Sequence, residues 1–417
     1  SASVYTGLND TSKMDTTTKA YRGSFDGNGK TISGLKLTTT AANSNVGLFG
    51  LVIGGKIQNF TVNGEIQIAV NDGDGRIGVI GQCDYTTVSG IESSVNITVA
   101  DGAKSYYVGG IVGDCQRNST VEKCVWYGAI DAIECGRVYF GGIVGRTGPS
   151  TITNCASYGT LRGTTSSKIH LHGIVSWAHH ADIKISNCLF AGTMDAAGVH
   201  LSAIANVGNH TLENYSNLYY AEGSATKIVM YDSRTTEDET QKKLAATVTS
   251  LTQNQLSDGT AVLRLNGDAA DGVWMLDTFT INGAEYKLPG FDGELITGVC
   301  NETGCQGTYI NGICSANYAH YQAAVYNETD SVYEISNAGQ LFWFAKKVNA
   351  KEYSINGKLM ADIDLENREW TPIGNFDGDA RNIDKAYKGS FDGNGKTISG
   401  LKLTTTTDAN SNVGLFG

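Results

Sequence analysis

Short glycine-bounded aliphatic segments recur along the first half of the chain at a nearly constant spacing. The segments VGLFG, IGVIG, VGGIVG, FGGIVG, HGIVS and SAIAN end at Gly50, Gly81, Gly113, Gly145, Ser176 and Asn206. Successive ends are 31, 32, 32, 31 and 30 residues apart. Two positions before each end lies an aliphatic residue: Leu48, Val79, Ile111, Ile143, Ile174 and Ile204. A fixed period with a conserved apolar position in every unit predicts stacked structural repeats.

Further apolar columns follow the same register. A second segment of each unit carries Ile57, Val88, Val121, Ile152, Ile185 and Leu212. Three positions later come Phe60, Ile91, Cys124, Cys155, Cys188 and Tyr215, and six positions after these Ile66, Ile97, Ile130, Leu161 and Met194. The segments are short and β-branched and lack the 3.6-residue period of a helical repeat. They predict a mostly-β fold, a parallel β-solenoid of about six coils of ~31 residues, stacked ~4.8 Å apart and closed by a small α-containing cap.

The repeated units also carry a family resemblance. The stretch YRGSFDGNGKTISGLKL at Tyr21–Leu37 stands before G-[LIV]-[FIV]-G units. Together they resemble the GLUG-motif repeats of bacterial surface and adhesin proteins, over roughly Tyr21–Ala221 and again over Tyr387–Gly417. Ser176 and Asn206 depart from the pattern, where the closing Gly is replaced. The resemblance implies an extracellular or cell-surface location and adhesion or scaffolding more than catalysis, and it names no ligand.

The domain organisation follows from where the period stops and restarts. We expect a solenoid over residues 1–221, a closing cap with a helix over 222–291, a cysteine-containing linker over 292–330, and a second module over 331–417 that opens with a helix capped by Ser336 or Asn337, a strand and a first coil. The eighteen residues GSFDGNGKTISGLKLTTT occur identically at Gly23–Thr40 and Gly389–Thr406, and 366 residues separate Tyr21 from Tyr387. We therefore expect a window of a longer tandem polypeptide. The alternative is a subunit whose C-terminal segment caps the next subunit.

Charge and hydropathy exclude several classes of partner. Lys and Arg number 31 and Asp and Glu 42, for a net charge of −11, which disfavours nucleic acid and anionic lipid as partners. No apolar run approaches the ~20 residues of a membrane helix, so membrane insertion is not expected. The expected partners are copies of the chain or adjacent tandem modules, with glycans or a host surface as the alternative.

The cysteines fall into three groups. Cys124, Cys155 and Cys188 form one column, which we interpret as small buried hydrophobes of the core. Cys83 and Cys115 also align one coil apart and are a candidate cross-coil disulfide. Cys300, Cys305 and Cys314 have C-x4-C-x8-C spacing, a weak zinc pattern without a fourth ligand nearby, so one disulfide and a free thiol are favoured. No cofactor is expected.

Aromatic and acidic residues supply the remaining candidate sites. His170 and His200 share a column with Tyr107 and Tyr139, which favours an aromatic ladder over a metal site. The two tyrosines are the candidate glycan-facing aromatics. The loop residues Asp377, Asp379, Asn382 and Asp384 are weak calcium candidates, as are Asp72 and Asp74, although turns favour the same residue types.

These observations predict a structural subunit of a bacterial extracellular fibre or surface stalk, built from tandem solenoid modules in head-to-tail assembly. A glycan- or host-binding adhesin module is the alternative. A polysaccharide-active β-helix enzyme is the least favoured, because no coil face gathers several charged residues and the sequence contains no G-x-S-x-G, H-E-x-x-H or P-loop motif. We therefore expect no enzymatic activity and assign no catalytic residue.

Overall fold

The computed structural model describes residues 20–39, 45–71, 74–163, 169–178, 180–196, 200–208, 214–231, 239–266, 273–294, 296–305, 307–374, 386–404 and 414–417. The chain divides into two compact units. The first comprises residues up to Ser257 with Arg264–Gly267 and Asp277–Gly293, and the second comprises Asp258–Leu263, Asp268–Leu276 and Glu294–Gly417. Among the described residues, no helix combines the length and the apolar character needed to cross a membrane.

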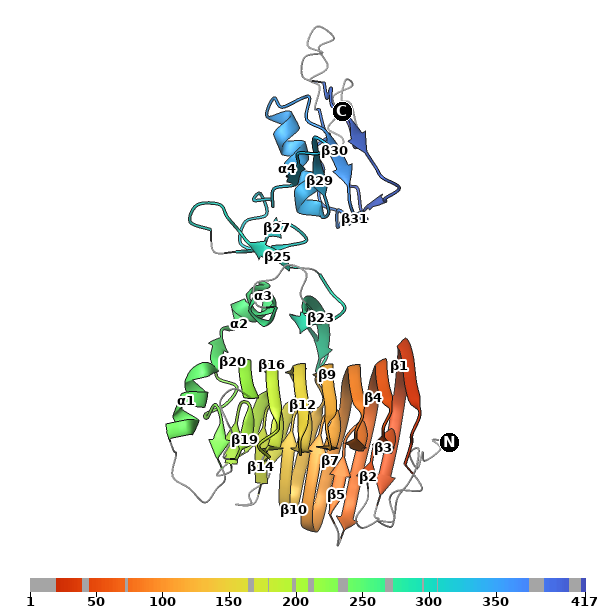
Figure 1. The fold of residues 1–417 in the computed structure, drawn as a ribbon, viewed down its shortest axis with the longest axis vertical. Helices are drawn as coiled ribbons and strands as arrows, with labels where there is room; N and C mark the ends of the chain where they lie inside the picture. The colour runs from red at the N-terminus through yellow and green to blue at the C-terminus, as the bar shows by residue number, and fades with distance from the viewer. Residues whose placement is uncertain are drawn as a thin grey trace. The chain divides into compact units, whose positions relative to one another are not determined.

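The first unit is a parallel β-solenoid, as predicted (Figure 1). One ladder of parallel strands contains β1 (Ser24–Thr39), β4 (Lys56–Asn71), β7 (Thr87–Gly109), β9 (Ser119–Trp126), β12 (Ser150–Ser157), β16 (Lys184–Phe190), β20 (Tyr215–Ala221) and β22 (Thr249–Leu251). A second sheet contains β3 (Phe49–Ile53), β6 (Ile80–Asp84), β8 (Val112–Gln116), β11 (Val144–Thr147), β15 (Val175–Ala178), β19 (Ala205–Val207) and β21 (Met230–Tyr231). The remaining solenoid strands are β2 (Asn45–Val46), β5 (Gly75–Ile77), β10 (Ala129–Gly141), β13 (Thr160–Gly163), β14 (Ile169–His172), β17 (Thr193–Ala196) and β18 (His200–Ser202).

The stack is longer than predicted. The first ladder has eight strands among the described residues, where about six coils were expected. It continues beyond residue 221, because β22 pairs with β20 in parallel through Ala221↔Leu251. The repeat also shifts by three residues near its end, since Cys188 pairs with Leu218 and Ile185 with Tyr215. The prediction that Tyr215 continues the cysteine column is therefore wrong, and Leu212 lies outside the described residues.

A column of left-handed residues bends the coils at one corner. Equivalent positions have φ between 49° and 62°: Asn59, Gly90, Lys123, Asn154, Asn187 and Asn217. Glycine and asparagine adopt this conformation at low cost, whereas other L-residues are strained in it. The column therefore explains why the sequence places Asn or Gly at this corner in every coil but one.

The glycines of the repeated motif are fixed by the closeness of the next coil. A Cβ added at Gly47 would lie 2.4 Å from the Gly78 carbonyl oxygen and 2.6 Å from that of Val79. At Gly110 the corresponding contact, with the Gly142 carbonyl oxygen, is 2.3 Å. Real Cβ atoms do not approach backbone so closely, so only glycine allows the coils to stack at strand spacing.

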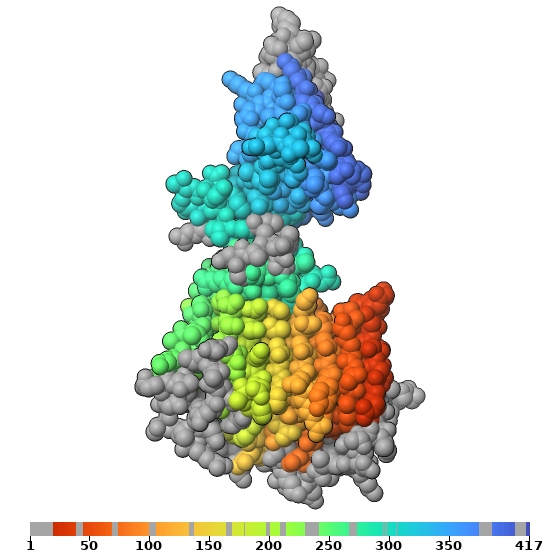
Figure 2. Space-filling model, viewed as in Figure 1, coloured from red at the N-terminus to blue at the C-terminus, as the bar shows by residue number. Residues whose placement is uncertain are grey.

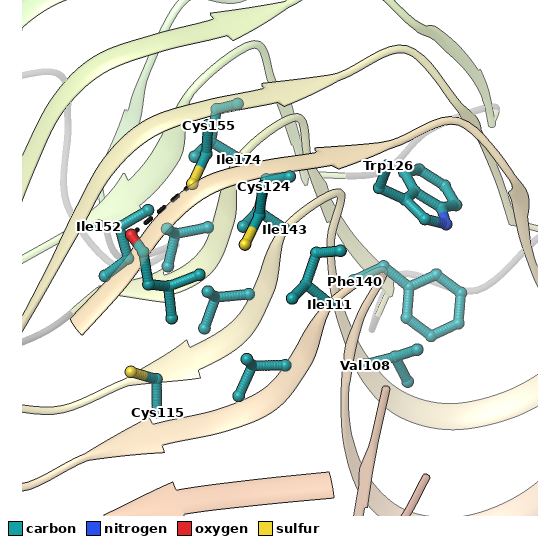
Figure 3. Packing of buried hydrophobic residues seen from close by; sticks show 14 of the residues in the cluster. Val108, Ile111, Cys115, Cys124, Trp126, Phe140, Ile143, Ile152, Cys155 and Ile174 are labelled. Atoms are coloured by element: carbon teal, nitrogen blue, oxygen red, sulfur yellow. Dashed lines mark hydrogen bonds between the residues drawn. The ribbon is translucent and has the colours of Figure 1, made fainter. Parts of the chain in front are cut away.

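The interior is one continuous apolar core. Ile111, Ile143 and Ile174 lie in successive coils and are fully buried, with Cys124 and Cys155 beside them (Figure 3). Figure 2 shows the coils of this unit as successive bands from red to green. Because one coil cannot cover its own apolar face, the core exists only through stacking.

Three helices and a hairpin follow strand β21 in the chain, and β22 lies between the first and second of these helices. They are α1 (Glu239–Thr247), α2 (Gln253–Ser257), α3 (Thr260–Leu265), β23 (Met275–Ile281) and β24 (Ala284–Gly290). The hairpin packs on the solenoid, since the Phe279 ring contacts those of Tyr127 and Tyr158 with centroids 5.4 Å apart in each case. The Tyr158 hydroxyl also donates to the Pro289 carbonyl at 2.5 Å.

The second unit contains a small antiparallel sheet and then a helix packed on short strands. The sheet contains β25 (Ile296–Val299), β26 (Thr308–Ile310) and β27 (Ile313–Cys314). The later elements are β28 (Val325–Asn327), β29 (Val332–Ile335), α4 (Ala338–Asn349), β30 (Gly357–Leu359), β31 (Ile363–Asp364), β32 (Phe391–Asp392) and β33 (Ile398–Ser399). Helix α4 begins where the sequence predicts, because the Asn337 side chain accepts from the Gln340 amide. Parallel pairs join β29 to β30, β30 to β32 and β31 to β33, so this unit begins a second stack.

Candidate functional site

The predicted core cysteine column is present. Cys124, Cys155 and Cys188 are aligned in adjacent strands and fully buried. Each thiol donates to the carbonyl two residues earlier, at 3.1–3.2 Å. Burial, with hydrogen bonds to the neighbouring thiols, raises the pKa of Cys155 well above its usual value. A buried thiol that resists ionisation is a packing group and a poor nucleophile or metal ligand.

Cys83 and Cys115 are brought together as predicted. They are paired positions of β6 and β8, and both are buried free thiols. A hydrogen bond with the Cys115 thiol, and burial, raise the pKa of Cys83 well above its usual value. The alignment permits a cross-coil disulfide, which stays a prediction.

The aromatic column forms a stacked ladder. The Tyr139 ring stacks on Tyr107 at a centroid distance of 5.3 Å and on His170 at 4.6 Å. Trp177 meets Tyr139 edge-on at 4.6 Å. Tyr139 is only 3 % exposed, so the prediction that its ring faces a glycan is wrong. His200 pairs with His170 in the next strand, and its side chain lies outside the described set.

An ionic cluster lies against this ladder. The Asp114 carboxylate is fully buried and accepts from the guanidinium Nε atoms of Arg76 and Arg146, each at 3.0 Å. The Arg146 guanidinium also covers the Tyr107 ring, 4.2 Å from its centroid. Burial opposes the charge of Arg146, but the hydrogen bond to Asp114 and its charge outweigh this and raise the pKa. The buried carboxylate of Asp114 is thus paired with two guanidinium groups. Because Arg76, Asp114 and Arg146 lie in three successive coils, these ion pairs connect the three coils.

A second group of acids was missed in the sequence, because it joins segments far apart in the chain. Glu92 of β7 is near Asp277 of β23 and Asp292. Burial, and then the charges of Asp277 and Asp292, raise the pKa of Glu92 to about 7. Burial disfavours the charged form of Glu92, and the two neighbouring carboxylates add to this effect.

Cys300, Cys305 and Cys314 converge in the second unit together with a residue that the sequence analysis missed, His320. One ligand atom from each of the four side chains lies within 4.8 Å of the others. Burial opposes ionisation of Cys300, but hydrogen bonds from the Glu302 amide, Tyr309 and the other two thiols lower its pKa to about 7. His320 follows Cys314 by six positions, a spacing that a search restricted to cysteines does not test.

The other candidate positions give no site geometry. Asp377, Asp379, Asn382 and Asp384 lie outside the described residues, as does Asp72. A groove of about 520 Å³ lies elsewhere on the solenoid, lined by Asn118, Ser119, Thr120, Ser150, Thr151, Ala181, Asp182, Lys184 and Asn214. It offers hydroxyl, amide and charged groups, and no aromatic ring is among these lining residues.

Comparisons with known proteins leave the function open. No protein-family model matches the chain, and no curated protein matches it. The GLUG resemblance therefore stays a prediction. The chain is similar to the crystal structure of a "putative immunoglobulin A1 protease" from Bacteroides ovatus, with 18 % identity and a TM-score of 0.42 over 70 % of this chain and 82 % of the other. At this distance the match carries no argument about function.

Proposed function

We propose that the chain is a structural subunit of a bacterial extracellular fibre or surface stalk, in which solenoid modules follow one another head to tail. One observation carries the proposal: the same eighteen residues supply strands of a parallel stack in both units. Tyr21 bridges Val52 and β1 pairs with β4 in the first unit, while β32 and β33 stack on β30 and β31 in the second. A sequence used twice as part of a parallel stack is typical of tandem modules.

The construction of the solenoid suits a mechanical role. The hydrogen bonds between parallel strands are directed along the stack, and the apolar core continues through every coil. Separating any two coils therefore requires breaking several backbone hydrogen bonds at once and exposing the core. The Arg76–Asp114–Arg146 cluster adds an ionic connection across three coils.

A glycan-binding adhesin is the second candidate function, and the polar groove supports it. Its hydroxyl and amide side chains could bind sugar hydroxyls. Since Tyr139 is buried within its ladder and the Arg146 guanidinium covers the ring of the half-buried Tyr107, the groove replaces the tyrosines as the candidate binding face. Binding to a glycan array that is lost in Asn118→Ala and Asn214→Ala variants would favour this function.

Electron microscopy of the native surface material, labelled with antibodies to this chain, tests the proposal. Long fibres labelled at a regular axial interval, one label per 366-residue module, are the expected result. Labelling confined to discrete particles that do not join end to end would contradict it. Release of product from pectin, alginate or host glycans by the purified chain would contradict the expectation that it has no enzymatic activity.

A further inference from the structure

The cysteine–histidine cluster of the second unit has the composition and compactness of a metal site. The Cys300 Sγ atom lies 3.6 Å from His320 Nδ1, and the Cys305 and Cys314 Sγ atoms lie 3.3 Å apart. Zn–S bonds of about 2.3 Å and Zn–N bonds of about 2.0 Å place tetrahedral ligands roughly 3.5–3.8 Å from one another. The observed separations bracket this range, with 4.8 Å as the upper limit for the four atoms. Small side-chain adjustments would therefore complete a tetrahedron.

Backbone hydrogen bonds position the four ligands. The Cys300 amide donates to Gly307, and the Cys305 amide donates to Glu302, at 2.9 and 3.0 Å. The Cys314 amide donates to the His320 carbonyl at 3.1 Å, which closes the loop between these two ligands. The cluster is thus formed by the fold of the segment and does not depend on a chance approach of long side chains.

The four ligands have few apolar neighbours of their own. Their apolar cluster consists of Cys300, Tyr309 and Cys314, with Cys305 packed against them. Small apolar clusters of this kind are commonly supplemented by disulfides or a structural metal. A Cys305–Cys314 disulfide would use two of the four side chains and leave Cys300 beside His320. A metal ion would use all four.

We propose that Cys300, Cys305, Cys314 and His320 bind one structural Zn²⁺ ion. Three sulfur ligands and one imidazole form a soft, tetrahedral donor set, which selects zinc over calcium or magnesium. The Asn317 side chain contacts the outer nitrogen of His320, Nε2, at 2.9 Å, so Nδ1 faces the cysteines. This site is independent of the proposed fibre function.

The site is connected to the start of helix α4. Residues of the turn before Cys314 hold the helix N-terminus, because the Asn311 side chain accepts from the Ala338 amide at 3.2 Å and its carbonyl accepts from Gly339 at 2.9 Å. On the other side, Tyr321 follows His320 and stacks on Phe342 of α4 at 5.2 Å. A metal ion at the cluster would therefore fix the two loops that flank the helix.

Titration of the reduced 417-residue chain with Co²⁺ tests the proposal. We expect one equivalent to give the visible absorption of tetrahedral cobalt with thiolate charge-transfer bands, and one equivalent of Zn²⁺ to displace it. His320→Ala should weaken binding by at least about tenfold, whereas His320→Cys should retain the site and shift the bands toward four-thiolate ligation. His180→Ala is the matched control, because His180 is exposed and distant in sequence from the cluster, and it should leave the titration unchanged.

Several results would overturn the zinc site. One is the absence of a tetrahedral spectrum from the reduced, folded chain, with folding checked by circular dichroism. Another is equal weakening by His180→Ala and His320→Ala. Mass spectrometry that finds a Cys305–Cys314 disulfide in the chain as isolated from its natural source would assign the cluster to a disulfide. None of these results depends on whether the chain forms fibres, so failure of the zinc site and failure of the proposed function are distinguishable.

Discussion

The same eighteen residues adopt different structures in the two units. In the first copy, Gly23–Thr40, they form the sixteen-residue strand β1, and Leu35 is 6 % exposed. In the second copy, Gly389–Thr406, the described residues form two strands of two residues each, and Leu401, the counterpart of Leu35, is 41 % exposed. The first copy is covered by the following coil, β4, whereas the second rests on strands that precede it. Neighbouring coils, and not the local sequence alone, therefore determine how much strand forms.

The tight turn within this sequence does not depend on the neighbours. Asn28 and Gly29 have φ of 51° and 66°, and their counterparts Asn394 and Gly395 have φ of 45° and 68°. Turn geometry is thus encoded locally by residues that tolerate the left-handed region, while strand length and burial require a template. The four predictions that follow test this division, from the largest expected effect to the smallest.

Gly47 and Gly414 are equivalent positions of the repeated VGLFG motif. Alanine substitution at these two positions should give the largest difference in stability between the two units. A Cβ at Gly47 would meet the backbone of the next coil at 2.4 Å, whereas at Gly414 the nearest contact is 3.0 Å, with the Phe416 oxygen. We expect Gly47→Ala to destabilise the first unit by about 3 kcal/mol and Gly414→Ala to change the stability of the second by less than about 0.5 kcal/mol. Thermal unfolding followed by circular dichroism measures both, and equal effects would contradict the templating account.

Alanine substitution at the equivalent positions Leu35 and Leu401 should give the next largest difference in stability. Leu35→Ala removes a buried side chain and should cost about 2–3 kcal/mol, detected as faster hydrogen exchange in β1. Leu401→Ala removes a partly exposed side chain in the same local sequence, so its cost should be below about 0.5 kcal/mol. Comparable losses at the two positions would mean that the second copy is as well covered as the first.

The stability of the first unit should depend on pH through the ionisation of Glu92. Its pKa is raised from 4.5 to about 7 in the folded chain, so folding is penalised once the carboxyl ionises. The contribution of Glu92 to stability should be most favourable below about pH 4.5 and should fall by about 2 kcal/mol as the pH rises through 7, after allowance for partial exposure. Glu92→Gln should remove this loss, whereas Glu65→Gln, an exposed carboxylate paired with Lys36, should leave it in place. A Glu92→Gln variant with an unchanged pH profile would show that another group titrates.

A substitution in the column of left-handed residues at the coil corner should give a small gain in stability. Lys123 occupies it with φ of 53°, where the adjacent aligned coils have Gly90 and Asn154. Lys123→Asn should stabilise the first unit by about 0.5–1 kcal/mol, because asparagine tolerates this conformation better than lysine. The control Lys184→Asn lies in strand β16 and should give no gain. A loss at position 123 would indicate that the lysine side chain contributes contacts of its own.

The sequence predicted the solenoid and most of its columns because stacked coils repeat the same environment every 30–32 residues. Ile111, Ile143 and Ile174 could be aligned without a structure for this reason. Prediction failed where the period broke, as at Tyr215, and where side chains meet across the corner of a coil, as at Tyr139. Contacts between segments distant in the chain, such as Glu92 with Asp277, leave no periodic signal. His320 was missed because its spacing from Cys314 acquires meaning only once the loop between them is folded.

The most direct test extends the chain beyond Gly417. The last five residues, VGLFG, are identical to Val46–Gly50, so residues 51–266 can be joined after Gly417 without altering the motif. Hydrogen exchange can then follow the two copies separately, since peptides that begin at Tyr21 contain Arg22 and those that begin at Tyr387 contain Lys388. The account predicts that protection of the second copy rises at least about tenfold, to the level of the first, once a following coil can cover it. Unchanged protection, although the added residues fold as a solenoid, would contradict the claim that the second copy opens another module of the same stack.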